Sequence, residues 1–243
     1  MEEISIKAQP IFQLGHFMVT NGLLSTVVVS LVIIWVAILL HRRITLIPGR
    51  VQSVVEMGME WLLDLMESML GSVKEAEQYL PLIATIFLFI LLCNLSGILP
   101  GVGSFTIYNG SATVPLFRSP AADLNFTLSF AVISVIVTNL IGMASVGVFA
   151  HLGKFFNFRN PVKFFIGILE IISEFAKIIS LSFRLFGNIF AGEVLLIVIF
   201  SLFRLFIPLP FIFLEIFVGL IQSLVFAVLT LVSIAIHTGI HDH

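Results

Sequence analysis

The stretch that decides the fold is FFIGILEIISEFAKIISLSFRLFGNIFAGEVLLIVIFSLF, residues 164–203. It contains no proline and is nearly twice as long as the roughly 20 residues that a helix needs to cross a bilayer. Its five charged side chains are Glu170, Glu174, Lys177, Arg184 and Glu193. A charge near the bilayer centre costs about 2.5 to 3.5 kcal/mol on insertion scales, so such side chains face protein or water. The stretch therefore predicts a long membrane helix with a functional polar side.

The composition of the whole chain is that of a membrane protein. Hydrophobic residues make up 59% of the 243 residues and charged residues only 11%, whereas about a quarter of the residues in a soluble domain are charged. We therefore expect an all-α integral membrane protein in contact with the lipid bilayer. The net charge of -2 offers no basic surface, which excludes nucleic acid as a partner. Cys93 is the only cysteine, so the chain can form no internal disulfide.

The hydrophobic pattern predicts one membrane domain over residues 1–243 with about five transmembrane helices. The spans are expected at 22–40, 79–99, 124–152, 164–206 and 211–236, of which 164–206 is the long charged helix. Residues 1–21 precede the first span as an outer N-terminal segment. The first ten residues, MEEISIKAQP, are acidic where a signal peptide is basic. We therefore expect the first span to be retained as a membrane helix.

Residues 48–78 have a different pattern, which predicts an interfacial helix and a connection. Between residues 51 and 70, apolar side chains recur at helical spacing and alternate with four acidic ones. These acids are Glu56, Glu60, Asp64 and Glu67. Such an amphipathic helix suits the membrane surface better than the bilayer interior. A helix of a small soluble subdomain is the alternative, although little chain surrounds it to build a core.

Lysine and arginine residues predict the orientation, because cytoplasmic connections carry an excess of them. With five spans, seven of these residues fall on one side of the membrane and three, Lys7, Arg118 and Arg204, fall on the other. The N-terminus is therefore expected outside and the C-terminus in the cytoplasm. No transit peptide is visible, so we expect a bacterial plasma (inner) membrane, although an organelle-encoded protein would look similar.

Five polar side chains of the long helix fall within an arc of about 80° when each residue turns the helix by 100°. They are Glu170, Glu174, Lys177, Arg184 and Asn188. This seam runs about 27 Å along the helix axis. Glu193 lies nine residues after Arg184, on the opposite face and about 13 Å along the axis. Arg184 and Glu193 are therefore expected to face different partners.

The charges of the seam also have a purely structural explanation. Glu170, Glu174 and Lys177 have i,i+3 and i,i+4 spacing and could pair with one another on the helix surface. Arg184 has no acid three or four residues away on either side. An intramembrane arginine without a local partner indicates an acid on another helix or another chain.

Four further polar residues map to the outer half of the membrane together with Glu193. They are Asp123, Asn125, Glu215 and Gln222. Glu215 could instead pair with Arg204, and Asp123 could be the N-cap of the third span. The acids and the lysine at the start of the long helix map to the inner half. The pattern thus predicts two offset polar zones with a fixed positive charge between them, a pathway that does not run straight through the membrane.

Four stretches resemble the a-subunit family of F-type ATP synthases, the membrane stators beside the rotating c-ring. RLFGNIFAGE (184–193) resembles the signature of that family, and SPAADLNFTLSFAV (119–132) resembles the entry to its middle span. IQSLVFAVLTLVSIAIH (221–237) is similar to its final helix, and IPGRVQSVVEMGMEWLLDLM (47–66) to its interfacial helix. The resemblance extends from about residue 46 to residue 243.

The resemblance implies a non-catalytic subunit with two offset half-channels for protons and with no cofactor or metal of its own. Arg184 would meet the carboxylate of each passing c subunit and block a direct leak. By the same resemblance, the outer half-channel takes Asn188 and Glu193, the inner one takes Glu170 and Lys177, and the last helix contributes Glu215 and Gln222. The implied partners are the c-ring and the peripheral-stalk b subunits, and the last two helices would be strongly tilted.

Two other functions are open on the residues alone. A stand-alone ion-coupled secondary transporter would show internal repeats and broken helices, and we find no convincing repeat. An intramembrane enzyme would need a motif such as H-E-x-x-H or G-x-S-x-G, and the sequence contains neither. His237, His241 and His243 could gather around a metal, but we interpret them as a polar C-terminal tail.

Overall fold

The computed structural model describes residues 10–14, 17–45, 48–99, 106–109, 112–155, 161–203 and 206–238. The helices are α1 (Asn21–Arg43), α2 (Arg50–Leu70), α3 (Val73–Ser96), α4 (Leu124–Val146), α5 (Val148–Phe155), α6 (Pro161–Leu202) and α7 (Pro208–Thr238), with a 3-10 turn, η2 (Pro120–Ala122). The strands form two short antiparallel hairpins, β1 (Pro10–Leu14) with β2 (Phe17–Thr20) and β3 (Thr106–Asn109) with β4 (Ala112–Pro115). Within these residues, five helices are long and apolar enough to cross a membrane: α1, α3, α4, α6 and α7. The expectation of an all-α membrane protein is confirmed.

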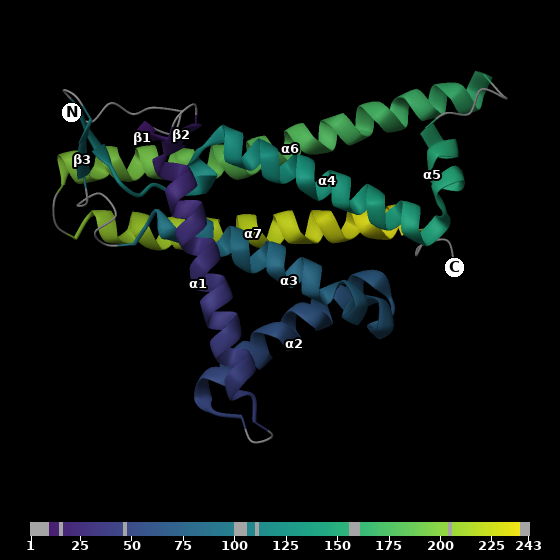
Figure 1. Ribbon diagram of the computed structural model, residues 1–243, viewed down its shortest axis with the longest axis horizontal. Helices are drawn as coiled ribbons and strands as arrows, with labels where there is room; N and C mark the ends of the chain where they lie inside the picture. Colours follow the sequence, from purple (N-terminus) through teal and green to yellow (C-terminus); the bar gives the residue numbers. More distant parts are fainter. Residues whose placement is uncertain are drawn as a thin grey trace.

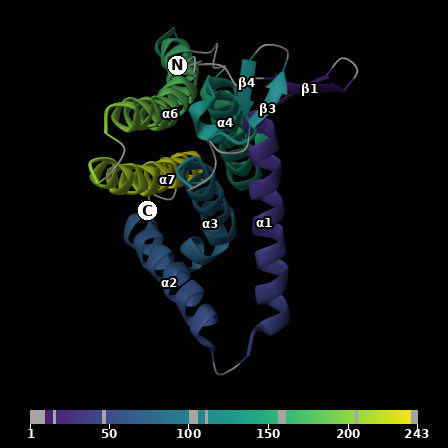
Figure 2. The same cartoon turned by 90° about the vertical axis from the view of Figure 1, so that its left-hand side faces the viewer.

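The two longest helices, α6 and α7, lie side by side along the longest dimension of the molecule (Figure 1). Helix α1 runs across their direction and stands at one side of the bundle (Figures 1 and 2). The 42 residues of α6 extend about 63 Å, whereas the hydrocarbon core of a bilayer is about 30 Å thick. A helix of that length stays within the membrane only when it is strongly tilted. If α1 crosses the bilayer upright, its direction across that of α6 agrees with such a tilt (Figure 1).

Helices α3, α4 and α7 pack through small and hydroxyl-bearing side chains. Ala131 of α4 is fully buried. Ser134 Oγ of α4 lies 3.0 Å from Thr230 Oγ1 of α7, and Asn94 Nδ2 of α3 donates to the Gly219 carbonyl of α7 at 2.9 Å. Small residues and interhelical hydrogen bonds hold helices together in lipid, where apolar surface by itself drives little association.

Helix α2 is amphipathic, as its sequence pattern predicts. Leu62, Met66 and Leu70 are buried on one face at a four-residue spacing, and this face packs against α3. The helix ends at Gly71, whose φ of 75° is in the left-handed region that favours glycine, and the Gly71 N–H donates to the Glu67 carbonyl. In the described chain, α2 is not among the helices with the composition of a span.

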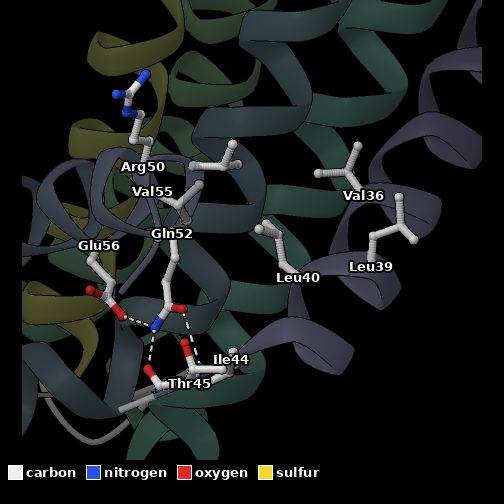
Figure 3. A pocket seen from close by; sticks show the side chains of 11 residues that line it. Val36, Leu39, Leu40, Ile44, Thr45, Arg50, Gln52, Val55 and Glu56 are labelled. Carbon is white, nitrogen blue, oxygen red and sulfur yellow. Dashed lines mark hydrogen bonds between the residues drawn. The ribbon is translucent and has the colours of Figure 1, made fainter. Parts of the chain in front are cut away.

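The chain turns sharply between α1 and α2, and Gln52 holds this turn (Figure 3). The Gln52 side-chain amide donates to the Thr45 carbonyl at 3.0 Å and to Glu56 Oε1 at 2.8 Å, while its oxygen accepts from the Thr45 N–H at 3.2 Å. Side chains of both helices line an open cavity of about 640 Å³ here, including Val36 and Leu40. The lining is mostly aliphatic, which suits contact with lipid.

Helix α6 ends at Leu202 rather than at residue 206, and α7 begins at Pro208 rather than at residue 211. Two other boundaries differ more from the hydrophobic pattern. Helix α3 begins at Val73 rather than at residue 79. Its first turn contains Lys74 and Glu75, so hydrophobicity does not indicate this turn although it is helical. The predicted span 124–152 is divided into α4 and α5 at Gly147, whose φ of 94° and ψ of 142° turn the chain. The connection between the predicted spans 79–99 and 124–152 contains the hairpin of β3 and β4.

The last helix extends further than expected. Helix α7 continues to Thr238, and the side chain of His237 is only 2% exposed. The interpretation of His237 as part of a polar tail is therefore wrong, because the last turn of α7 packs it between α4 and α6. His241 and His243, which were given the same interpretation, lie outside the described residues, as does Arg204.

Candidate functional site

Glu174 is the centre of a polar cluster where α4, α6 and α7 meet, and its side chain is largely buried. Lys177 Nζ, on the same helix, donates to Glu174 Oε1 at 2.5 Å. Asn139 Nδ2 of α4 donates to Glu174 Oε2 at 3.1 Å, and His237 Nε2 of α7 lies 3.4 Å from Oε1. A buried carboxylate requires such partners. Glu174 and Lys177 thus pair with each other on the same helix, as the structural explanation of the seam predicts. Glu170, one turn earlier, is half-buried.

Two histidines complete this cluster, and neither was among the predicted site residues. His151 Nε2 of α5 lies 3.1 Å from Asn139 Oδ1, so Asn139 connects His151 to Glu174. The rings of His151 and His237 are 5.4 Å apart. Gly142 makes room for both, since a Cβ atom there would lie 2.7 Å from His237 Cβ and 3.0 Å from His151 Cε1. Only the bend between α4 and α5 brings His151 back against α4, and no periodic pattern indicates this.

A cavity of about 320 Å³ between α4, α6 and α7 joins this cluster to Arg184. Lys177 and Arg184 both line it. The other polar side chains of its wall carry hydroxyl groups: Ser134, Thr138, Ser173, Ser180, Thr230 and Ser233. A cavity of this size with several hydroxyl groups can hold water molecules.

The side chain of Arg184 is exposed, and its Nη2 donates to Ser180 Oγ at 3.2 Å. Among the described residues, no carboxylate forms an ion pair with it. Asn188, one turn later on α6, is also exposed. The Arg184 side chain is thus accessible from outside the helix bundle, and it also forms part of the cavity wall.

The side chains of the predicted polar seam of α6 lie in different environments, some buried and some exposed. Leu181, Leu185 and Ile189 form the buried stripe of this helix. Glu174 is close to the line of this stripe, whereas Arg184, ten residues later, is rotated by about 80° relative to Glu174. The inner end of the seam is therefore buried and the Arg184 end is exposed.

A second polar cluster surrounds Glu193, about 28 Å further along α6 than Glu174. Arg118 Nε lies 3.0 and 3.2 Å from the two Glu193 carboxylate oxygens, and Arg118 Nη2 lies 3.0 Å from Oε2. These side chains are 9% and 29% exposed, respectively. The Arg118 guanidinium also lies 6.0 Å from the ring centre of Phe190. The predicted site did not include Arg118, although a single charged residue shortly before Asp123 and the third span indicates a charged partner.

Glu215 of α7 belongs to the same region, and 8% of its surface is exposed. Gly192, next to Glu193, lets the Glu215 carboxyl group approach α6, since a Cβ atom on Gly192 would lie 3.1 Å from Glu215 Cδ and Oε1. Glu215 Oε2 has no hydrogen-bond partner in the described part of the chain. Pairing of Glu215 with Arg204 falls outside the described residues.

The other predicted residues lie at the edges of these clusters. Asp123 is buried and is the N-cap of α4, accepting from the Asn125 N–H at 3.0 Å, so the capping alternative is observed. The Asn125 side chain is exposed, and Gln222 is half-buried. Within the described ranges, no hydrogen bond joins the Asn125 or Gln222 side chain to either cluster.

These features define a class of protein. It is a multi-pass helical membrane protein with ionisable clusters towards both ends of one long helix and an exposed arginine between them. Ionisable groups held inside a membrane bundle are typical of ion pathways and proton relays.

Comparison with known proteins gives the family. A family model described as ATP synthase A chain matches residues 23–235, and the chain belongs to this family. It is 32% identical over 238 residues to ATP synthase subunit a of Moorella thermoacetica, covering 98% of this chain and 99% of the relative. It is 34% identical over 218 residues to ATP synthase subunit a of Campylobacter concisus, covering 88% of each. The resemblance inferred from the four motifs is confirmed.

Proposed function

We propose that this chain is the membrane stator, subunit a, of a rotary ATP synthase and that it provides two offset half-channels for protons. The observation that carries the proposal is the environment of Arg184. Its side chain is exposed, pairs with no carboxylate among the described residues, and lines the cavity that reaches the Glu174 cluster. An intramembrane arginine that pairs with no acid in the described part of its own chain indicates an acid on another subunit.

Arg184 acts as a fixed positive charge in this proposal. A guanidinium remains protonated at any working pH, so it repels protons that arrive from either side. It attracts the deprotonated carboxylate of a c subunit and releases that subunit once the carboxylate is protonated. Protons therefore cross only by travelling on the c-ring, driven by about 2.3 kcal/mol per charge for each 100 mV.

The inner half-channel in this proposal is the hydroxyl-lined cavity between α4, α6 and α7. Glu170, Glu174 and Lys177 form its entrance, and Arg184 forms its end. The support is that one cavity has both Lys177 and Arg184 in its wall. Water along the hydroxyl groups would carry protons between these two points.

The outer half-channel in this proposal surrounds Glu193 and Glu215. Glu193 has a partly exposed side chain, and Glu215 has a carboxylate oxygen without a hydrogen-bond partner in the described chain. The remaining residues that we assign to this half are Asp123, Asn125, Asn188 and Gln222. The position of Glu193 on the helix face opposite Arg184 keeps the two half-channels apart.

We further propose that the chain assembles with the c-ring and with peripheral-stalk b subunits in a bacterial plasma membrane. The N-terminus would lie outside and the C-terminus in the cytoplasm, following the distribution of Lys and Arg. Large apolar side chains of α6, including Phe175, Ile179 and Phe183, are exposed, and Phe183 directly precedes Arg184 in the chain. An exposed apolar helix surface that also carries a charged group suits a partner helix that brings a carboxylate.

The test is ATP-driven proton pumping by inverted membrane vesicles that contain the assembled enzyme. We expect Arg184→Ala to abolish pumping while the subunit still inserts, as shown by immunoblotting of the membranes. Arg42→Ala, at the exposed end of α1, is the matched control and should pump normally. Normal pumping by Arg184→Ala would exclude Arg184 from the mechanism.

Purification distinguishes this proposal from a stand-alone transporter. A stator should co-purify in mild detergent with a ring of small two-helix subunits. Isolation of the chain alone, in a form that moves an ion across liposomes, would favour the transporter instead.

A further inference from the structure

The contacts of His237 determine which ring nitrogen of its neutral imidazole carries the proton. Its Nδ1 lies 2.6 Å from the Ser233 carbonyl oxygen, and because a carbonyl only accepts, Nδ1 must carry the proton. In the neutral ring, Nε2 therefore presents a bare lone pair. Nε2 is buried without a hydrogen-bond partner in the described chain and lies 3.4 Å from Glu174 Oε1. At this distance the two groups attract each other only when Nε2 carries a proton or when a cation lies close to both.

Glu170 adds a third group to this pair. One oxygen from each of Glu170 and Glu174 and one nitrogen of His237 all lie within 4.8 Å of one another. Two carboxylates and an imidazole are a ligand set that Zn²⁺ accepts. A histidine that binds a metal usually donates its other ring N–H to a carbonyl or carboxylate, and the contact from His237 to Ser233 has this form.

The packing around His237 holds it in this orientation. Gly142 allows α4 to approach His237 so closely that a Cβ atom there would lie 2.7 Å from the His237 Cβ atom. The ring is 2% exposed, whereas Glu170 is half-buried. His237 is the last residue but one of α7, so the three groups lie close to the end of this helix.

We propose that Glu170, Glu174 and His237 form a binding site for a divalent transition-metal ion of the Zn²⁺ class. The Lys177 ammonium now neutralises Glu174 and competes with such an ion. Its side chain is 29% exposed, lines the cavity, and already lies 3.5 Å from Ser233 Oγ. Binding of the ion displaces Lys177 from Glu174 into this cavity.

The consequence for conduction rests on the proposed function. A divalent ion balances the charges of Glu170 and Glu174, so the displaced Lys177 ammonium becomes an uncompensated positive charge in the cavity, at the entrance of the inner half-channel. Protons moving towards Arg184 would be repelled there. The site would therefore make proton conduction sensitive to Zn²⁺ added on the cytoplasmic side.

Metal binding is measured first, on the full chain purified in lipid nanodiscs. Co²⁺ reports on ligand geometry through its visible absorption, and Zn²⁺ affinity is obtained by displacement of Co²⁺ and by calorimetry. Changing a residue that merely orients a ligand costs about 10–100-fold in affinity, so loss of a ligand should cost at least about tenfold. We expect this loss for His237→Ala and Glu170→Gln, and tighter binding for Lys177→Ala.

The matched control is the double variant His241→Ala/His243→Ala, which removes the other histidines near the C-terminus. It should bind Zn²⁺ as the parent chain does. Loss of binding in this control, with binding retained in His237→Ala, would overturn the site. Unchanged affinity in Glu170→Gln would also overturn it, and this variant covers the case in which His237→Ala fails to fold. Absence of any spectrum of protein-bound Co²⁺ would overturn the metal site.

Conduction is measured second, in vesicles stripped of the catalytic head. We expect Zn²⁺ on the cytoplasmic side to reduce proton flux in the parent and to have at least about tenfold less potency in Glu170→Gln. Zn²⁺ binding without any effect on flux would overturn the blocking role. Absence of proton flux in metal-free vesicles would instead count against the proposed function, so the two failures are distinguishable.

Discussion

The Arg118 guanidinium donates to both carboxylate oxygens of Glu193. The distances are 3.0 Å from Nε to Oε1 and 3.0 Å from Nη2 to Oε2. The two residues are 75 positions apart in the sequence. Arg118 lies in the segment just before η2, and Glu193 lies in the second half of α6. The ion pair connects the segment that precedes η2 and α4 to the long helix α6.

A double-mutant cycle on this pair should reveal coupling. Arg118→Gln leaves the Glu193 carboxylate partly buried without its cation, which is costlier than removing both charges. We expect the double variant Arg118→Gln/Glu193→Gln to be more stable than Arg118→Gln, with an interaction energy of about 1 kcal/mol or more. Unfolding in mixed micelles of mild detergent and SDS measures this. Strictly additive effects would show that the contact contributes nothing to stability.

Gly192→Ala should disturb Glu215. The added Cβ would lie 3.1 Å from the Glu215 carboxyl group, so this group must move away from α6. If Glu215 belongs to the outer half-channel, proton flux through stripped vesicles should fall severalfold. Gly58→Ala is the control, because a Cβ there meets nothing within 4 Å. Equal flux in both variants would argue that the position of Glu215 is unimportant.

Gly142→Ala should destabilise the junction of α4, α5 and α7. Its Cβ would lie 2.7 Å from His237 Cβ and 3.0 Å from His151 Cε1, and overpacking of this kind costs about 1–3 kcal/mol. Gly153→Ala on α5 is the matched control, since that position is open. The measurement is the unfolding midpoint of the full chain in detergent. A midpoint for Gly142→Ala equal to that of Gly153→Ala would contradict the close packing of the two histidines.

Lys177→Met should slow proton flux through stripped vesicles. It keeps the length of the side chain but removes the ammonium that donates to Glu174 and lines the cavity. Lys163→Met lies on the same helix at an exposed position and should conduct normally. If both variants conduct like the parent, the cavity is not the inner half-channel.

Much of this architecture could be predicted from local patterns. The length and hydrophobicity of α6 indicate a helix too long for an upright span, and the alternation within residues 51–70 indicates the amphipathic α2. The isolation of Arg184 could also be predicted, because positions three and four residues away hold no acid. Each of these properties belongs to one segment of chain, so it appears in the sequence without knowledge of any neighbour.

The partners of the charged side chains were decided by the tertiary structure. Asn139 reaches Glu174 from another helix, 35 positions away, and His237 reaches it from α7. The turn at Gly147 returns His151 to α4, where an uninterrupted span would have carried it away. By itself, the sequence determined the membrane class, the long charged helix and an arginine without a local acid. Only the packing decided which ends of the seam are buried, because the rotation and crossing of helices depend on side chains from several segments at once.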